Sequence, residues 1–478
     1  METQQTIQFF AETDVGRERD HNEDNFLVDK KLSLFVVADG MGGHAAGEVA
    51  SALAVRTVHE ELRRERALLQ DFADGASGAA RVTVKELLNL LEFAVHQACK
   101  RIYEEARLDP AKRGMGTTLS LLLVSGTRGF IAHVGDSRIY LVRDGAGRQI
   151  TEDHTVLNEL IKRGKLTREQ IERVAQKNAI TRALGVYERV DADTLSFDLL
   201  PGDQLVLCSD GLHGYVDTMA DLEQPLSNVD GQVAARALIN MANERGGKDN
   251  ITVVLVRVVG QGTEVDKQRV EQVALKHDVL KGVPLFGRLT ERELMRVMQI
   301  TEVRSYKLGD TVIQEGELGD EFFIVLSGQV TVLKGDAVLS TLGRGEHFGE
   351  MAMIRNQPRS ASVVAASEAE IGAIKRADFF EIIRTAHEMA VKLLWQFLGV
   401  LSDRLDQTSR DLRTAREEID AEDITAEVFP EFEVPASFRE TLGPMHSEPC
   451  MVSVDDAVRG SPVIGPAVPF QRIVGDDD

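Results

Sequence analysis

Residues 35–44 read FVVADGMGGH, an apolar run that stops at Asp39 and is followed by several glycines. Such a run is typical of a buried strand, so Asp39 is expected where the strand leaves the core. Gly40, Gly42 and Gly43 allow the backbone to turn tightly and a ligand to approach it closely. The stretch therefore indicates a phosphate site, a metal site or a simple turn.

Acidic residues recur at the ends of apolar runs in this half of the chain. Asp136 follows IAHVG, Asp210 follows LVLCS, Asp249 precedes NITVVLV, and residues 13–24 (TDVGRERDHNED) add further acids. Carboxylates gathered at one sheet edge repel each other unless a cation neutralises them. Because all these ligands are oxygens, they favour Mg²⁺ or Mn²⁺ over a simple turn-capping role. The glycines are not followed by GK[ST], which excludes a nucleotide-phosphate loop.

Composition narrows the function classes further. The chain has 478 residues, enough for two or three domains, and a formal net charge of −22. This charge argues against nucleic acid or an anionic membrane as a partner, since both attract basic surfaces. The cysteines, Cys99, Cys208 and Cys450, lack metal-binding spacing, which suits a reducing compartment. Without a signal-peptide pattern or an apolar run of about 18 residues, we expect a cytoplasmic protein.

The pattern of apolar residues predicts an α+β fold class. Up to residue 258, short strands alternate with helical stretches at 47–69 and 83–107, which indicates packed sheets covered by helices. The expected strands are 7–10, 32–38, 118–124, 129–134, 137–142, 205–208 and 251–258.

The pattern changes from residue 283 onward. Glycines recur between short β-rich pieces, as in a small β-barrel, and a helix is expected from about 376 to 418. We expect four parts, of which the last contains the end of this helix and an acidic, disordered tail. Their limits are 1–258, 259–282 (a linker and helix), 283–400 and 401–478.

Eight motifs of the first part occur in the order typical of a known family. They are TDVGRERDHNEDN, VVADGMGGHAAGEVAS, GMGTTLSLLLV, AHVGDSRIYLVRDG, ITEDHT, ITRALG, LVLCSDGLHG and GGKDNITVVLV. In these, the segment 5–258 resembles the bacterial form of the metal-dependent serine/threonine protein phosphatases (the PPM, or type 2C, family). The resemblance implies an αββα sandwich with a two-metal centre, bound to Mn²⁺ or Mg²⁺.

The same resemblance assigns roles to individual residues. Asp39 would bridge both metals and the Gly40 carbonyl would bind one, while Asp210 and Asp249 would hold the other. Two metals that share a water lower its pKa from 15.7 towards about 7, and the hydroxide attacks phosphorus without a phosphoenzyme. The remaining metal-site residues are Glu23 and Asp24, which would support the site directly or through water, and Asp136, a ligand of a third, weaker metal.

Substrate binding is assigned with two departures from the family pattern. Arg19 matches the arginine that holds the substrate phosphate, since a guanidinium binds phosphate in a bidentate way. Met41 stands where animal members carry a histidine proposed as general acid, and His44 lies three residues later, so no acid is assigned. The flap-like segment 154–184 has Val174-Ala175 where relatives often carry His-Pro.

A second candidate site lies in residues 347–363, HFGEMAMIRNQPRSASV. Glu350 and Arg359 form either a surface salt bridge or the polar contacts of an anionic ligand. A cyclic nucleotide offers a ring phosphate for Arg359 and a ribose 2′-hydroxyl for Glu350. The backbone amides of Gly349 and Ala352, at the start of a short helical turn, would add donors.

The segment 283–385 resembles cyclic-nucleotide-binding domains. PLFGRLTERELMRVM matches their entry helices, GDTVIQEGELGDEFFIVLSGQVTVL their barrel (jelly-roll) strands, and FGEMAMIRNQPRSAS their phosphate-binding cassette. The resemblance carries the binding roles to Gly349, Glu350, Arg359 and Ser360. Ser360 is compatible with either cyclic AMP or cyclic GMP.

The leading hypothesis is a cyclic-nucleotide-regulated phosphatase that acts on phosphorylated Ser/Thr proteins and counteracts bacterial serine/threonine kinases. The alternative is a nucleotide sensor or scaffold with little or no phosphatase activity. A transcription regulator is disfavoured because 386–418 is one helical stretch without the turn of a helix-turn-helix motif. That helix carries a wide apolar stripe with Trp395 beside it. The stripe indicates either a homodimer through 386–418 or a lid in which Trp395 stacks on the purine.

Overall fold

The computed structural model describes residues 6–42, 46–75, 82–162, 179–260, 263–354 and 357–428. Across these ranges, none of the helices combines the length and apolarity needed to cross a membrane. The chain divides into two compact units, one of residues 1–404 and one of residues 405–478. The expected domain limits stay a prediction, and the tail expected to be disordered lies outside the described residues after 428.

Two antiparallel sheets form the N-terminal half. One has the order β1-β11-β10-β7-β8 and the other β2-β3-β5-β6-β9, with a short strand β4 paired to β3. Apolar side chains from the facing surfaces of both sheets, such as Phe35, Leu141 and Val256, form the core between them. The strands are β1 (Thr6–Asp14), β2 (Asp24–Asp29), β3 (Leu34–Met41), β4 (Gly116–Thr117), β5 (Leu119–Ser125), β6 (Arg128–Val134), β7 (Arg138–Arg143), β8 (Ala146–Gln149), β9 (Asp193–Asp198), β10 (Gln204–Cys208) and β11 (Ile251–Val259).

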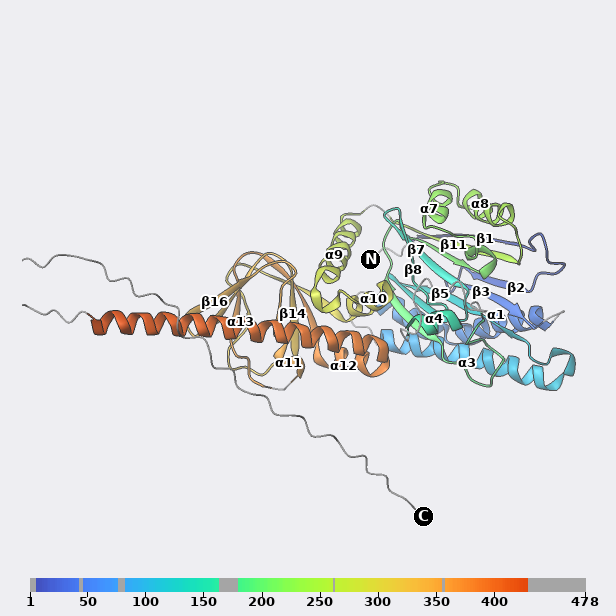
Figure 1. Cartoon of the computed structure of the whole chain (residues 1–478). Helices are drawn as coiled ribbons and strands as arrows, with labels where there is room; N and C mark the ends of the chain where they lie inside the picture. The colour runs from blue at the N-terminus through green and yellow to red at the C-terminus, as the bar shows by residue number, and fades with distance from the viewer. Residues whose placement is uncertain are drawn as a thin grey trace, which may run out of the picture. The chain divides into compact units, whose positions relative to one another are not determined.

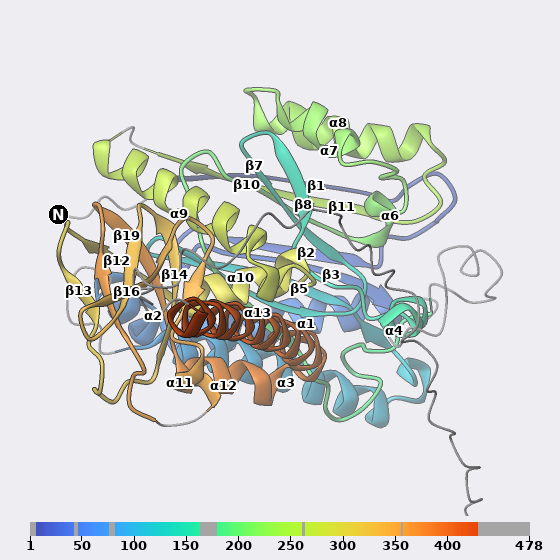
Figure 2. The same ribbon diagram turned by 60° about the vertical axis from the view of Figure 1, so that its left-hand side comes forward.

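Helices cover the outer face of each sheet. The helices α1 (Ala46–Arg64), α2 (Arg66–Gly75) and α3 (Val84–Leu108) pack on the sheet that contains β3. The helices α7 (Ala220–Leu226) and α8 (Gly231–Glu244) pack on the sheet that contains β11. Figure 2 shows the resulting layers in order, helices, sheet, sheet, helices. The predicted αββα sandwich is confirmed, although β2, β8, β9 and the α7–α8 layer were not among the expected elements.

Two helices connect this sandwich to the C-terminal half. They are α9 (Glu264–Gly282) and α10 (Glu291–Ile300), separated by a 3₁₀ turn at Pro284–Phe286. Capping boxes start both helices, Thr263 with Asp266 and Thr290 with Glu293, so each begins at a residue fixed by its own side chain. Helix α10 packs along β9, the strand at the edge of its sheet (Figure 1).

The C-terminal half contains two four-stranded sheets that share a core of residues such as Phe323, Val325 and Ile371. Two sheets packed face to face agree with the expected jelly-roll, although in the described residues their strands do not join into one closed barrel. The orders are β12-β19-β14-β17 and β13-β18-β15-β16. The strands are β12 (Thr301–Tyr306), β13 (Thr311–Ile313), β14 (Glu321–Ser327), β15 (Val330–Lys334), β16 (Ala337–Leu342), β17 (His347–Phe348), β18 (Ser362–Ala365) and β19 (Ala369–Lys375).

The helix expected from 376 to 418 is two helices. Helix α12 (Arg376–Thr385) ends at Ala386, whose backbone leaves the helical region, and α13 (His387–Val428) continues beyond the expected end. Met389, Ala390 and Leu393 of α13 are buried. The apolar stripe expected from the sequence only partly coincides with this buried face, because Leu394 is exposed.

Candidate active site and nucleotide site

The predicted carboxylates come from both sheets and gather at one end of the sandwich. Asp24 opens β2 and lies opposite Asp39 near the end of β3 in the antiparallel register. Asp210 lies two residues after the end of β10, and Asp249 lies two residues before β11, the antiparallel partner of β10. Strand topology therefore brings residues together that are far apart in the sequence.

Burial and mutual repulsion raise the pKa values of these carboxyls. Burial raises the pKa of Asp39 well above its ordinary value, and the neighbouring charges of Asp24, Asp210, Asp136 and Asp249 raise it further. Burial also raises the pKa of Asp210, with Asp249 adding to the rise. Several negative charges in one poorly solvated place are unfavourable, so the site favours either protons or a cation.

The pKa values of Asp24 and Asp136 are both strongly raised. Burial raises the pKa of Asp24 to about 7, although its Oδ2 accepts hydrogen bonds of 2.7 Å from the hydroxyls of Ser209 and Thr252. Burial and the charges of Asp210 and Asp153 raise the pKa of Asp136 to about 7. The two hydroxyls fix Asp24 in place, which agrees with a supporting position in the site.

The donor set fits a hard cation. Within the described residues, Oδ1 of Asp136 and Oδ1 of Asp210 are buried without a hydrogen-bond partner, as expected of atoms that ligate an ion. Gly40 leaves room beside the Glu23 carbonyl, which a Cβ would approach to 2.6 Å. No three His, Cys, Asp or Glu side chains of the described ranges are gathered as a finished metal site. An ion would therefore have to draw these oxygens together.

Asn250 organises the loop that carries Glu23, a role that was not expected from the sequence. Its Oδ1 accepts a hydrogen bond of 2.8 Å from the Glu23 amide. Its Nδ2 donates to the carbonyls of Val15 and His21 at 3.0 and 2.8 Å. The Glu23 carbonyl in turn accepts from the Gly40 amide at 3.2 Å. The motif KDN contained this signal, because an amide next to a predicted metal ligand has both donors and an acceptor.

Arg19 lies at the rim of the same site. Its Nη2 donates to Oδ2 of Asp249 at 2.7 Å, and half of its side chain is exposed to solvent. The arginine predicted to hold phosphate therefore contacts a predicted metal ligand. Exposure of the guanidinium leaves it accessible to an incoming phosphate.

Two expectations near the site fall outside the described residues, namely those on His44 and on Val174-Ala175 of the flap. Met41 is the last residue of β3. An unexpected imidazole, His213, ends the helix α6 (Asp210–His213). Burial lowers the pKa of His213 to about 4, with Arg138 adding to the effect, so this ring is neutral near pH 7.

The predicted nucleotide-binding residues lie together in the C-terminal half. The guanidinium of Arg359 donates to the carbonyls of Glu321 at 2.9 Å and Gly349 at 3.4 Å, and it lies 5.7 Å from the Phe323 ring centroid. Burial lowers the pKa of Arg359, while the carboxylates of Glu321, Asp320 and Glu350 oppose the shift. Carbonyls and an aromatic face orient the guanidinium without neutralising it, which suits an anionic ligand.

The other residues predicted to bind nucleotide differ in burial and in backbone geometry. Glu350 is buried, with 6% of its surface exposed, and Ser360 is exposed. Gly349 has φ +80°, a left-handed conformation that glycine adopts without strain, and a Cβ there would meet the Arg359 side chain. The amide of Ala352 already donates to the Gly349 carbonyl at 3.1 Å in the short helix α11 (Met351–Ile354). Its role as a phosphate donor stays a prediction.

Comparisons with known proteins match both halves of the chain. The family model described as Protein phosphatase 2C matches residues 16–252, and that described as Cyclic nucleotide-binding domain matches residues 303–386. A "Serine/threonine phosphatase stp" from Listeria innocua is 40% identical over 250 residues, which cover 51% of this chain and 93% of that protein.

Solved structures of similar proteins cover the same half. The Mycobacterium tuberculosis serine/threonine phosphatase PstP/Ppp is 34% identical, with a TM-score of 0.46, and the match covers 53% of this chain and 99% of that one. The catalytic domain of a phosphatase PstP solved in complex with two manganese ions is 35% identical, with a TM-score of 0.44, covering 54% and 100%.

The raised pKa values of Asp24 and Asp136 predict how stability depends on pH. Unfolded Asp has a pKa near 4, so without metal the fold binds these protons more tightly than the unfolded chain. Stability is then greatest below about pH 4 for these two groups and is lost as the pH rises through about 7. The melting temperature of the chelated protein is expected to fall between about pH 5.5 and about pH 8.

Added Mn²⁺ should raise the melting temperature more at the higher pH, because it binds deprotonated carboxylates. Asp136→Asn should reduce the pH slope. Asp221→Asn is the control, since the Arg245 hydrogen bond lowers the pKa of Asp221 to about 2 and this carboxyl does not titrate between about pH 5.5 and about pH 8. Because burial lowers the pKa values of His133 and His213, these groups act on the wild-type slope with the opposite sign. A pH slope of Asp136→Asn equal to that of wild type would therefore contradict the assignment.

Proposed function

This chain belongs to the protein phosphatase 2C family and is a serine/threonine phosphatase, and we propose that cyclic nucleotide bound to its C-terminal half regulates the hydrolysis of phosphoserine and phosphothreonine in proteins. The observation that supports the catalytic part is the group of buried carboxylates from two sheets, with unpartnered oxygens on Asp136 and Asp210. Bacterial relatives named as phosphatases suggest substrates phosphorylated by serine/threonine kinases.

Seven residues of the phosphatase half are proposed to form the metal site. Asp39, Asp210, Asp249 and the Gly40 carbonyl would hold two Mn²⁺ or Mg²⁺ ions, which supply a water of lowered pKa as the nucleophile. Glu23 and Asp24 would support that site, and Asp136 would ligate a third, weaker ion.

Arg19 would orient the substrate phosphate. Its exposed guanidinium has five donors, of which one contacts Asp249 in this structure. The remaining donors are available for two phosphate oxygens, so binding of substrate does not require loss of the Asp249 contact.

Regulation by cyclic nucleotide rests on Arg359. Its charge is held by neutral partners and by the Phe323 face, next to the buried acid Glu350. In the bound state, Arg359 would pair with the ring phosphate and Glu350 would accept a hydrogen bond from the ribose 2′-hydroxyl. Gly349 and Ser360 would line the same site. Calorimetric titration distinguishes cyclic AMP from cyclic GMP as the ligand.

Self-association through α13 is the third part of the proposal. Val391, Leu398, Leu405 and Leu412 recur every seven residues and are each more than half exposed. Leu394 adds an exposed apolar residue between two of them. A seven-residue apolar repeat on an exposed helix is the signature of a coiled coil, so a second copy of α13 is the partner we propose.

The proposed location is the cytoplasm. Cys99 and Cys208 are buried free thiols, which suits a reducing compartment. Trp395 has 67% of its surface exposed, and its role as a lid that stacks on the purine stays a prediction.

Asp210→Asn should reduce Mn²⁺-dependent hydrolysis of a phosphothreonine peptide by at least about 100-fold, because it removes one negative metal ligand. Circular dichroism should show an unchanged fold. The matched control is Asp144→Asn in the β7–β8 turn, where φ is +52° and Asn is well tolerated. Turnover near wild type in Asp210→Asn would sink the two-metal assignment and favour a sensor without phosphatase activity.

Arg359→Ala should weaken cyclic nucleotide binding by about 30-fold to several thousand-fold, since it leaves the bound phosphate without its charge partner. Calorimetry with cyclic AMP and cyclic GMP measures the change and identifies the preferred ligand. Arg344→Ala, which removes an exposed arginine from the same half, is the control. Equal affinities in wild type and Arg359→Ala would refute the assignment of Arg359.

Leu405→Glu should convert a dimer into a monomer in sedimentation velocity experiments, because it places a charge in the repeat. Arg410→Glu also adds negative charge to the same helix, but five residues further on and outside the repeat, so it should leave the dimer intact. A wild-type chain that sediments as a monomer at all concentrations would contradict self-association.

A further inference from the structure

Helix α10 contacts the phosphatase half through one face. Arg292, Arg296 and Gln299 lie three and four residues apart, so their side chains point in the same direction. Nη2 of Arg296 donates to the Thr194 carbonyl at 3.2 Å, and Nε2 of Gln299 donates to the Ser196 hydroxyl at 2.6 Å. This face of α10 therefore contacts strand β9 at two positions along its length.

Arg292 makes the strongest of these contacts. Its Nη1 lies 2.5 Å from Oδ2 of Asp193, at the start of β9, and 3.3 Å from Oε2 of Glu152. Only 14% of the Arg292 side chain is exposed, so solvent screens the pair weakly. Removal of one partner of such a pair leaves the other charge poorly compensated.

Asp193 connects Arg292 to a buried histidine. Its Oδ2 lies 3.3 Å from Nε2 of His154, and its Oδ1 accepts from Arg182 at 3.2 Å. Although burial opposes it, the His154 hydrogen bond and the Arg292 charge lower the pKa of Asp193, which is ionised at neutral pH. The His154 ring is also packed against His133, with 5.0 Å between ring centroids.

His154 in turn holds the loop before Asp136. Its Nδ1 accepts a hydrogen bond of 3.1 Å from the Gly135 amide, so its Nε2 carries the ring proton and faces Asp193. The His154 amide donates back to the Gly135 carbonyl at 2.8 Å. Gly135 has φ +107°, and a Cβ there would meet Thr118, so this turn has little freedom to relax. The next residue is Asp136.

We infer that Arg292 is a positioning residue through which the nucleotide-binding half controls the Asp136 loop of the phosphatase site, by way of Asp193, His154 and Gly135. This regulation rests on the proposed function, and it names the route by which nucleotide would act. Each link is a charged or geometrically specific hydrogen bond, and its partners range from partly exposed Arg292 and Asp193 to buried His154, so a small shift of α10 changes the restraint on Asp136. Nucleotide would act by favouring one of two positions of α10.

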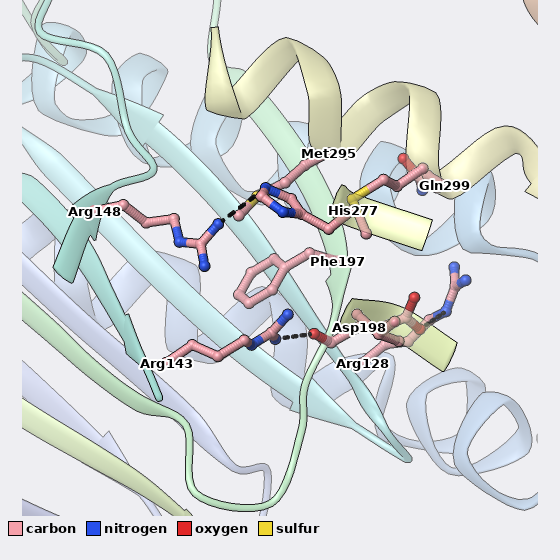
Figure 3. A pocket seen from close by; sticks show the side chains of 10 residues that line it. Arg128, Arg143, Arg148, Phe197, Asp198, His277, Met295 and Gln299 are labelled. Atoms are coloured by element: carbon pink, nitrogen blue, oxygen red, sulfur yellow. Dashed lines mark hydrogen bonds and ion pairs between the residues drawn. The ribbon is translucent and has the colours of Figure 1, made fainter. Parts of the chain in front are cut away.

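A neighbouring contact of the same interface provides a matched control. Nη1 of Arg148, on β8, lies 3.2 Å from Nε2 of His277 on α9 (Figure 3). The same Nη1 lies 3.2 Å from Oε2 of Glu291 at the start of α10. Like Arg292, it joins the sandwich to α10 through an ion pair. Among the described residues, Arg148 bonds to His277 and Glu291 and not to Asp193 or His154, so its loss weakens the interface and spares the route to Asp136.

The test is hydrogen–deuterium exchange of the full-length chain, read on peptides that contain Gly135 and His154. Arg292→Ala should speed exchange of these two amides by about tenfold, and Arg292→Lys, which keeps the charge, should restore part of the protection. Arg148→Ala should leave both amides as protected as in wild type. Calorimetric titration with Mn²⁺ should show weaker binding at the lowest-affinity site of Arg292→Ala only.

Exchange is then compared with and without saturating cyclic AMP or cyclic GMP. Nucleotide should change protection of the two amides in wild type and in Arg148→Ala, but not in Arg292→Ala. Unchanged amides in Arg292→Ala, or equal effects of both variants, would overturn the positioning role. Calorimetric binding of nucleotide that leaves wild-type exchange unaltered would overturn the coupling. A wild-type chain that binds neither nucleotide would refute the regulatory proposal, while the exchange of Arg292→Ala without ligand still decides the positioning role.

Discussion

Repulsion among carboxylates is the constraint on which the rest of this structure depends. Asp24, Asp39, Asp136, Asp210 and Asp249 are carried by strand ends of two different sheets, and the sandwich holds those ends together. The apolar core between the sheets supplies the favourable energy that opposes the repulsion. Around the acids, the hydroxyls of Ser209 and Thr252 donate hydrogen bonds to Asp24. Asn250 accepts from the Glu23 amide and donates to two backbone carbonyls of the same loop. The fold therefore stores an unfavourable charge arrangement that a cation relieves.

The sequence predicted the parts of the site that leave a local signal. An Asp that interrupts an apolar run, as at Asp39 or Asp210, is visible without the structure because strand and polar residue are adjacent. The helix α8 also carried a readable signal, since Asp230 caps it and Ala234, Leu238 and Ala242 repeat at helical spacing. By contrast, strand β9 (DTLSFD) is short and polar at both ends, and it resembles a loop in the sequence.

The contacts that join the two halves were not predictable in the same way. Arg292 and Asp193 are 99 residues apart, and neither differs in type from the many charged residues on the surface. Their importance arises only from burial and from the third partner, His154, which the topology brings to them. In the nucleotide-binding half, the identities of Glu350 and Arg359 followed from the sequence, whereas the use of the Ala352 amide within α11 required coordinates.

The position of α10 on β9 has a consequence for the modularity of the chain. Strand β9 is the last strand of its sheet, and an edge strand presents unpaired N–H and C=O groups to any chain that meets it. Arg296 donates a hydrogen bond to one of these carbonyls, that of Thr194, and helix α10 packs along the strand. Cutting the chain after β11 would expose that edge and the apolar side chains that Met295 covers. Transplanting the catalytic half alone into another protein would therefore leave β9 without the cover that α10 provides here.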